Sequence, residues 1–158
     1  LALAVHVTLF SHTVATLGET LALAWGEEAR CVTLEPVSFI DELDAYARET
    51  PRLAILGDAV AQAIAACPSS CELRVANLPP CALPADLRHH YATWVAPAAP
   101  VGVVAAGYAS ILAAITNDKS RAYASLCGSC SLRSSCRGVA AEYLAAFGDV
   151  ALPARSDV

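Results

Sequence analysis

Lysine is almost absent from this sequence. Lys119 is the only one among 158 residues, and the formal net charge is −5. A protein that binds a nucleic-acid backbone needs clustered basic residues to neutralise phosphates, and the chain has no such cluster. We therefore do not expect a nucleic-acid partner.

Methionine is absent altogether, and the chain begins within an apolar run. We therefore expect a piece of a longer protein. The apolar start has no basic segment before it, so it does not resemble a secretory signal. Seven cysteines are an odd number, which disfavours a secreted disulfide scaffold. Together these features favour the reducing cytoplasm.

Charge is missing from residues 89–117, and the apolar part of this stretch, residues 101–115, suggests a membrane helix by its composition. Prolines and glycines interrupt it, and no group of Lys or Arg flanks it. We predict a buried strand and helix there, and no membrane partner.

The chain does contain apolar residues at the regular spacings of strands and helices. Short β-branched runs at residues 3–9, 31–37 and 72–77 predict buried strands. Helical spacing lies between them, and also over residues 139–147 near the end. The apolar positions of the intervening helices are Val14, Leu17, Leu21 and Trp25, then Leu43 and Tyr46 after Ser38-x-x-Asp41, then Leu53, Leu56, Val60 and Ile64. This order predicts an α/β fold with a parallel sheet whose strands are neighbours in sequence order.

Polar residues follow each predicted strand. Ligands of parallel α/β folds meet the carboxyl ends of the strands, so Ser11, Glu35 and Asn77 are candidates for cofactor binding. Each also has a structural interpretation. Ser11 or Thr13 would cap the next helix, Glu35 would be solvated or cap a loop, and Asn77 would shape the turn before Leu78-Pro-Pro.

Three cysteines near the end have the spacing of a ligand set: Cys127-x2-Cys130-x5-Cys136. Thiolates select iron–sulfur clusters, zinc or copper(I). We favour an iron–sulfur cluster, with structural zinc as the alternative. A redox dithiol fits less well, because no strand precedes the pair and no long helix follows it.

Two other groups lack a full ligand pattern. Cys67-x3-Cys71 resembles the start of a cluster motif, but Arg74 stands where a third cysteine would be needed. The pair His89-His90 has no carboxylate or cysteine at a useful spacing, which predicts a surface position.

The tail resembles a known family. Leu132, Arg137-Gly138-Val139, Tyr143 and Phe147-Gly148, together with the three spaced cysteines, are similar to the C-terminal tail of radical S-adenosylmethionine enzymes. The closest likeness is to peptide maturases with a SPASM-like auxiliary-cluster extension, and Val75-Ala-Asn-Leu-Pro-Pro-Cys81 resembles a late barrel strand of that group. The resemblance implies half of a partial (βα) barrel over residues 1–92 and a Cys-rich, mostly helical tail over residues 93–158. It also implies an auxiliary 4Fe-4S cluster and a peptide substrate.

The sequence departs from that family in two ways. The C-x3-C-x2-C motif of the catalytic cluster is absent, so this chain alone should not generate radicals, and S-adenosylmethionine would bind only in a full-length parent. Ala140 stands where the family often has a fourth tail cysteine. We therefore assign Cys81 as the fourth metal ligand, with Cys31 as runner-up and an exogenous thiol, water or substrate as further alternatives.

These features lead to one function and two alternatives. The preferred interpretation is the C-terminal portion of a radical S-adenosylmethionine enzyme, completed by the missing N-terminal barrel half or by self-association. Whether the chain itself is an enzyme stays open. The alternatives are a zinc-stabilised non-catalytic domain and a degenerate peptide-binding protein.

Overall fold

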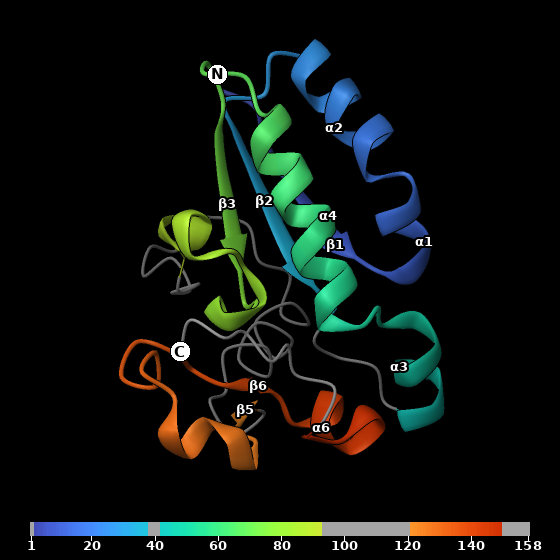
Figure 1. Cartoon of the computed structure of the whole chain (residues 1–158). Coiled ribbons are helices and arrows are strands. Elements are labelled where there is room, and N and C mark those ends of the chain that lie inside the picture. Colours follow the sequence, from blue (N-terminus) through green and yellow to red (C-terminus); the bar gives the residue numbers. More distant parts are fainter. Residues whose placement is uncertain (1, 38–41, 93–120, 150–158) are drawn as a thin grey trace, which may run out of the picture.

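A computed structural model describes residues 2–37, 42–92 and 121–149. The first part of the chain alternates strands and helices around a parallel sheet (Figure 1). Its elements are β1 (Ala4–Leu9), α1 (Ser11–Ala15), α2 (Leu17–Gly26), β2 (Cys31–Pro36), α3 (Leu43–Glu49), α4 (Leu53–Ala66) and β3 (Glu72–Ala76). Two 3-10 helices and a short strand follow: η1 (Pro80–Ala82), η2 (Ala85–His90) and β4 (Tyr91–Ala92).

The sheet has the order β1-β2-β3-β4, and every neighbouring pair is parallel. This confirms the predicted α/β class and the sequence order of the three main strands. Predicted and observed strand boundaries agree within about one residue, because β-branched runs bounded by turns are a strong local signal. The predicted segment Ser38-x-x-Asp41 and the predicted apolar stretch 101–115 lie outside the described residues.

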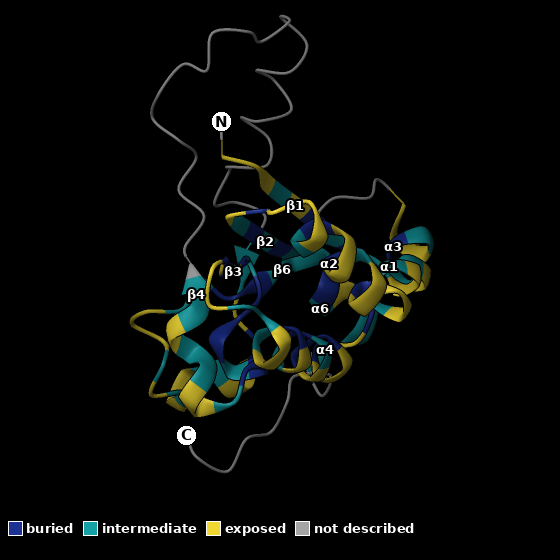
Figure 2. Ribbon diagram, turned by 90° about the horizontal axis from the view of Figure 1, so that it is seen from above, coloured by how far each residue is buried: buried dark blue, intermediate teal, exposed yellow. Residues whose placement is uncertain are grey.

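The hydrophobic core lies between one face of the sheet and helices α2 and α4 (Figures 1 and 2). Alternate strand residues point into it, and α2 and α4 contribute their apolar stripes. The strand residues are Val7, Leu9, Val32, Leu34, Leu73 and Val75, and the helix residues include Leu17, Leu21, Leu56 and Val60. The predicted helix with Val14 and Trp25 on one face is interrupted at Thr16, which divides it into α1 and α2.

The opposite face of the sheet is polar. We define the polar face as the strand residues whose side chains alternate with the core positions: His6, Thr8, Thr33, Glu35, Glu72 and Arg74. Each of these residues is half-buried or exposed. Parallel sheets usually bury apolar residues on both faces, so this asymmetry sets the polar face apart from an ordinary core surface.

The last described part contains a two-stranded antiparallel pair and one helix. Its elements are β5 (Arg121–Ala122), η4 (Ser125–Ser129), β6 (Val139–Ala140) and α6 (Ala141–Phe147). The predicted helix over 139–147 is therefore correct from Ala141 onward, while its first two residues pair with β5 instead. Helix α6 packs against α3, and Gly148 follows it with a positive φ of 72°, which glycine adopts at low cost.

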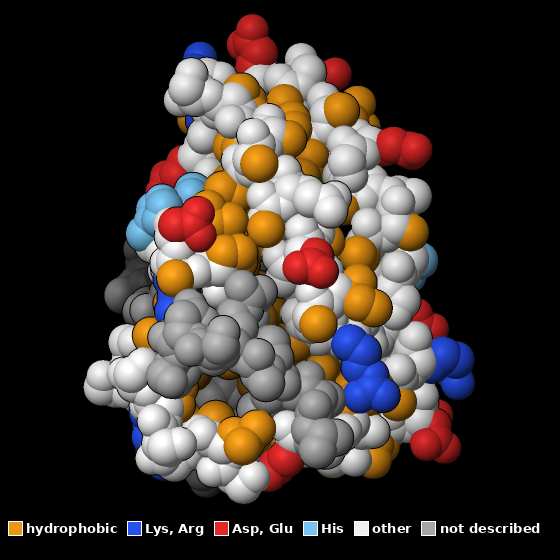
Figure 3. Space-filling view, viewed as in Figure 1, with side chains coloured by type: hydrophobic (Ala, Val, Ile, Leu, Met, Phe, Trp, Pro, Cys, Tyr) orange, Lys and Arg blue, Asp and Glu red, His pale blue; other side chains and the backbone are white. Residues whose placement is uncertain are grey.

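Apolar side chains also lie on the outer surface of the helices (Figure 3). Leu23 of α2 is 69% exposed and Ile55 of α4 is 54% exposed. Within the described ranges, no helix is both long and apolar enough to cross a membrane.

Candidate functional site

Glu35 and Asn77, two of the three strand-end candidates, meet at the carboxyl end of the sheet. Glu35 lies near the end of β2, and the side-chain amide of Asn77 donates a hydrogen bond from Nδ2 to its Oε1. Asn77 directly follows β3 and has a φ of 58°. Asparagine tolerates this left-handed conformation better than most residues, which explains its presence at this turn.

His6 is a third member of this site, which we did not predict. Its Nε2 lies 2.9 Å from Oε2 of Glu35. Strand periodicity contains the signal that could have found it, because His6 and Glu35 both occupy outward positions on neighbouring strands. The side chain of His6 is 45% exposed, whereas that of Glu35 is only 12% exposed.

The contacts shift the pKa values of both groups. The hydrogen bond to Glu35 raises the pKa of His6 above its ordinary value, despite the opposing effect of burial. Burial alone would raise the pKa of Glu35, but hydrogen bonds from His6 and Asn77 outweigh it, and the net pKa of the carboxyl lies below its ordinary value. Both shifts favour an ionised Glu35 beside a protonated His6.

Arg121 connects this site to the tail. Its Nη1 donates to the backbone carbonyl of Asn77 at 3.1 Å and to that of Gly138 at 3.4 Å. The guanidinium is largely buried, and this burial lowers its pKa. Its positive charge also contributes to the low pKa of Glu35. Arg121 therefore supports the turn at Asn77, and its strand β5 lies below the carboxyl ends of the main strands in Figure 1.

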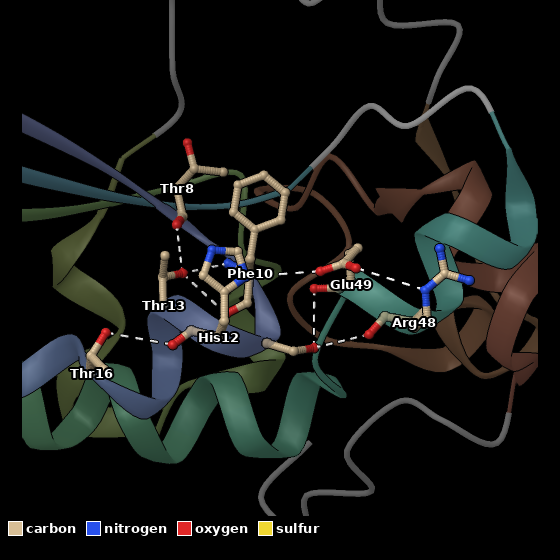
Figure 4. A network of polar contacts seen from close by, with 8 residues as sticks. Thr8, Phe10, His12, Thr13, Thr16, Arg48 and Glu49 are labelled. Carbon is tan, nitrogen blue, oxygen red and sulfur yellow. Dashed lines mark hydrogen bonds and ion pairs between the residues drawn. The ribbon is translucent and has the colours of Figure 1, made fainter.

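Ser11 lies elsewhere. Its hydroxyl donates to the backbone carbonyls of Arg48 at 3.3 Å and Glu49 at 3.1 Å, at the end of α3. The neighbouring Thr13 accepts a hydrogen bond from the backbone N–H of Phe10 and donates to the carbonyl of Thr8 (Figure 4). Thr13 thus has a capping contact at the start of α1, as its structural interpretation predicted, whereas Ser11 bonds to the end of α3 and does not cap the helix that follows it.

The four cysteines predicted as ligands are electrostatic neighbours. Cys81 lies in η1, just after the carboxyl end of β3. The pKa of its thiol is raised to about 11, mainly by burial and then by the thiols of Cys136, Cys130 and Cys127, in that order. A charge on any one of these sulfurs therefore disfavours a charge on Cys81, as expected for a group of thiols that needs a cation to become ionised together.

The tail loop is held by contacts around these cysteines. The backbone N–H of Gly138 donates to Sγ of Cys136 at 3.2 Å, and the Tyr123 hydroxyl donates to the Cys136 carbonyl at 2.7 Å. Arg133 donates to the carbonyl of Cys127 at 3.2 Å and stacks on the ring of Tyr123. The pKa of Cys136 is raised mainly by burial, although the Gly138 N–H opposes that effect.

The candidate metal-ligating side chains do not lie at metal-binding distances from one another. Across the described residues, no three His, Cys, Asp or Glu side chains are close enough together to hold an ion. A metal or cluster would thus have to draw the four thiols inward, and preformed sites are not required for tight binding.

Other cysteines lie near the amino ends of the strands. Cys31 begins β2, and its Cα pairs with that of Glu72 at the start of β3. Sγ of Cys67 contacts the carbonyl of Cys71, just before the same strand. These positions lie at the opposite end of the sheet from Cys81, which favours Cys81 over Cys31 as the partner of the tail cysteines.

No family model, curated protein or solved structure matches this chain. The polar face and the four cysteines are therefore the two groups of residues that bear on function.

Proposed function

We propose that this chain is the C-terminal portion of a radical S-adenosylmethionine enzyme and binds an auxiliary 4Fe-4S cluster through Cys81, Cys127, Cys130 and Cys136. The observation that carries the proposal is the raised pKa of Cys81, to which the thiols of all three tail cysteines contribute. Cys81 was predicted as the fourth ligand because the tail motif supplies only three cysteines. The pKa of its thiol is affected by all three of them.

The donor chemistry fits such a cluster. Iron–sulfur clusters are held by four cysteine thiolates, and hydrogen bonds to the sulfurs tune their reduction potentials. The N–H of Gly138 already makes one such bond, to Cys136. When bound, the cluster would transfer electrons or position substrate. The protein would hold it between η1 and the loop that η4 begins.

The sheet supports a barrel-derived origin. Two consecutive βα units followed by a third parallel strand match the repeating pattern of (βα) barrels, and in such a barrel the polar face would be the interior. Strand β1 is the edge of the described sheet, so its outer backbone is available for a missing N-terminal half or a second copy. A peptide substrate would then lie across the polar face, and the reducing cytoplasm would keep the thiols free.

Zinc is the alternative occupant. Four thiolates also form a closed tetrahedral zinc site, and the missing C-x3-C-x2-C motif favours a non-catalytic, zinc-stabilised domain or a degenerate peptide-binding protein.

The test is anaerobic reconstitution with iron and sulfide, followed by metal analysis of single variants. Wild type should turn brown, and Cys81→Ala should lose iron and sulfide nearly as severely as Cys130→Ala. Cys67→Ala is the matched control, because Cys67 is also half-buried but lies at the other end of the sheet. Unchanged iron and sulfide in Cys81→Ala would refute the ligand assignment, and a colourless protein with stoichiometric zinc would support the alternative.

A further inference from the structure

We infer that His6, Glu35 and Asn77 form a proton-transfer site on the polar face, in which His6 accepts a proton from a ligand bearing an O–H, N–H or S–H group. This inference does not depend on the cluster proposed above, because none of its three residues is a cysteine ligand. It concerns a histidine that the sequence patterns did not select.

Both hydrogen bonds of the three residues converge on the carboxylate of Glu35. Asn77 donates to Oε1 of Glu35, and Oε2 accepts the Nε2 proton of His6. At pH values above its raised pKa His6 is neutral, and the protonated Nε2 then leaves a free lone pair on Nδ1, the atom that can accept a proton. In the part of the chain that the structure describes, no hydrogen bond engages Nδ1.

The exposure of the pair is also asymmetric. The carboxylate of Glu35 is 12% exposed and is fixed by two partners, while the imidazole of His6 is 45% exposed. A proton acceptor needs access to its ligand, whereas the group that orients it needs a fixed position. A pair serving only to satisfy buried polar atoms would not require an imidazole that is nearly half exposed.

The surrounding charges leave Glu35 available to His6. Arg74, on the next strand, is engaged by Glu72, with Nε 2.8 Å from Oε1 and Nη2 2.7 Å from Oε2. Arg121 acts on Glu35 through its charge, from beneath Asn77. Among the described strand residues, Cys31, which alternates with the core positions of β2, and the hydroxyls of Thr8 and Thr33 lie on the same side of the sheet.

The rigid strands fix the geometry. His6 lies in the middle of β1, with its Cα paired to that of Thr33, and Glu35 is two residues further along β2. Side chains on adjacent strands are held at a constant spacing, so the imidazole and carboxylate are already aligned before a ligand arrives.

A simple ester provides a probe that requires no knowledge of the natural ligand. With p-nitrophenyl acetate, Nδ1 of His6 removes a proton from water as the water oxygen bonds to the carbonyl carbon. The ester C–O bond breaks, p-nitrophenolate leaves with its electron pair, and His6 returns the proton to solvent. The reaction consumes one ester and one water, and releases acetic acid and p-nitrophenol.

The experiment uses the full metal-free chain and measures p-nitrophenolate release against pH. His6→Gln should lower the rate by about 100-fold or more, the scale expected for a positioned base. Glu35→Gln should lower the rate and move the pH midpoint downward, because the hydrogen bond that raises the pKa of His6 is weakened. His12→Gln is the matched control, since His12 is an exposed histidine 3.8 Å from Glu49, and it should leave the rate unchanged.

Two results would overturn the inference. One is a wild-type rate in His6→Gln. The other is an NMR titration of the wild-type protein in which the pKa of His6 lies at or below 6.5. The NMR measurement decides the matter even if a variant folds poorly. Neither readout involves iron or zinc, so failure here is distinct from failure of the cluster proposal.

Discussion

The hydroxyl of Tyr143 accepts a hydrogen bond from the backbone N–H of Leu53 at 3.0 Å, although 90 residues separate them. Leu53 begins α4, and the first N–H groups of a helix have no partner within the helix. A side chain of α6 therefore caps α4. Nearby, the Arg52 guanidinium lies 4.1 Å from the centre of the Phe147 ring, which adds a second contact between the tail and the βα units.

This relationship predicts the effect of Tyr143→Phe. The variant keeps the ring but leaves a buried N–H without its acceptor, so the free energy of unfolding should fall by about 1–3 kcal/mol. Urea denaturation would measure it. Tyr123→Phe removes a hydroxyl that bonds at an exposed site and should cost less. Equal losses in both variants would contradict the capping role.

Gly138 predicts a second, larger contrast. Its φ is 81°, and an added Cβ would lie 2.3 Å from the carbonyl oxygen of Ala122 in β5. Gly138→Ala should therefore break the pairing of β5 with β6 and lower the free energy of unfolding by more than about 2 kcal/mol, since the backbone conformation alone costs about 1–2 kcal/mol. At Gly128, nothing lies within 4 Å of an added Cβ. Gly128→Ala is thus the control, and thermal denaturation of both variants checks the difference.

The thiol of Cys81 predicts a pH dependence in metal-free protein. Its pKa is raised to about 11, so the reactive thiolate is scarce at neutral pH. Alkylation of Cys81 by iodoacetamide should be slow near neutrality and should accelerate steadily as the pH approaches that value. Peptide mass spectrometry would follow this site alone. Rapid alkylation of Cys81 at neutral pH would show that the thiol is neither buried nor near the tail thiols.

The His6–Glu35 pair predicts where in pH it stabilises the fold. The folded pKa of His6 lies above 6.5, so its contribution is complete below 6.5 and is lost as the pH rises through the folded value. The folded pKa of Glu35 lies below 4.5, so its contribution is complete above 4.5 and is lost as the pH falls through the folded value.

The stability difference between wild type and Glu35→Gln should consequently be greatest between pH 4.5 and 6.5. We expect a difference of only about 0.5–1 kcal/mol, because His6 is nearly half exposed and water screens the pair. Urea titrations across this range would show it, with the exposed Glu27→Gln as control. A difference that stays constant with pH would mean that the pair is not ionised as described.

Local patterns in the sequence were enough to predict most of the sheet. Val5 and Val7 in β1, or Val32 and Leu34 in β2, lie in runs whose composition and length specify strands without reference to distant residues. The same runs did not reveal His6, because a parallel strand was expected to be apolar on both sides, and the polar face of this sheet departs from that rule.

The candidate site could be predicted only in part, because the positions of its side chains depend on how distant elements pack together. Ser11 and Asn77 follow strands in the same manner, yet Ser11 bonds to the end of α3 and Asn77 turns toward Glu35. That outcome depends on where α3 packs and on the left-handed backbone at Asn77, neither of which a strand-end pattern contains. Arg121 was unforeseen for a similar reason, because a two-residue strand is too short to leave a periodic signal.

Arg121 has one more consequence. A single guanidinium binds the carbonyl of Asn77, beside Glu35, and the carbonyl of Gly138, two residues from Cys136. The tail and the polar face thus share a component, and a displacement of the guanidinium changes the surroundings of both. If the tail binds the proposed cluster and the polar face binds a ligand, thermodynamic reciprocity applies: the factor by which the cluster changes the affinity for the ligand must equal the factor by which the ligand changes the affinity for the cluster.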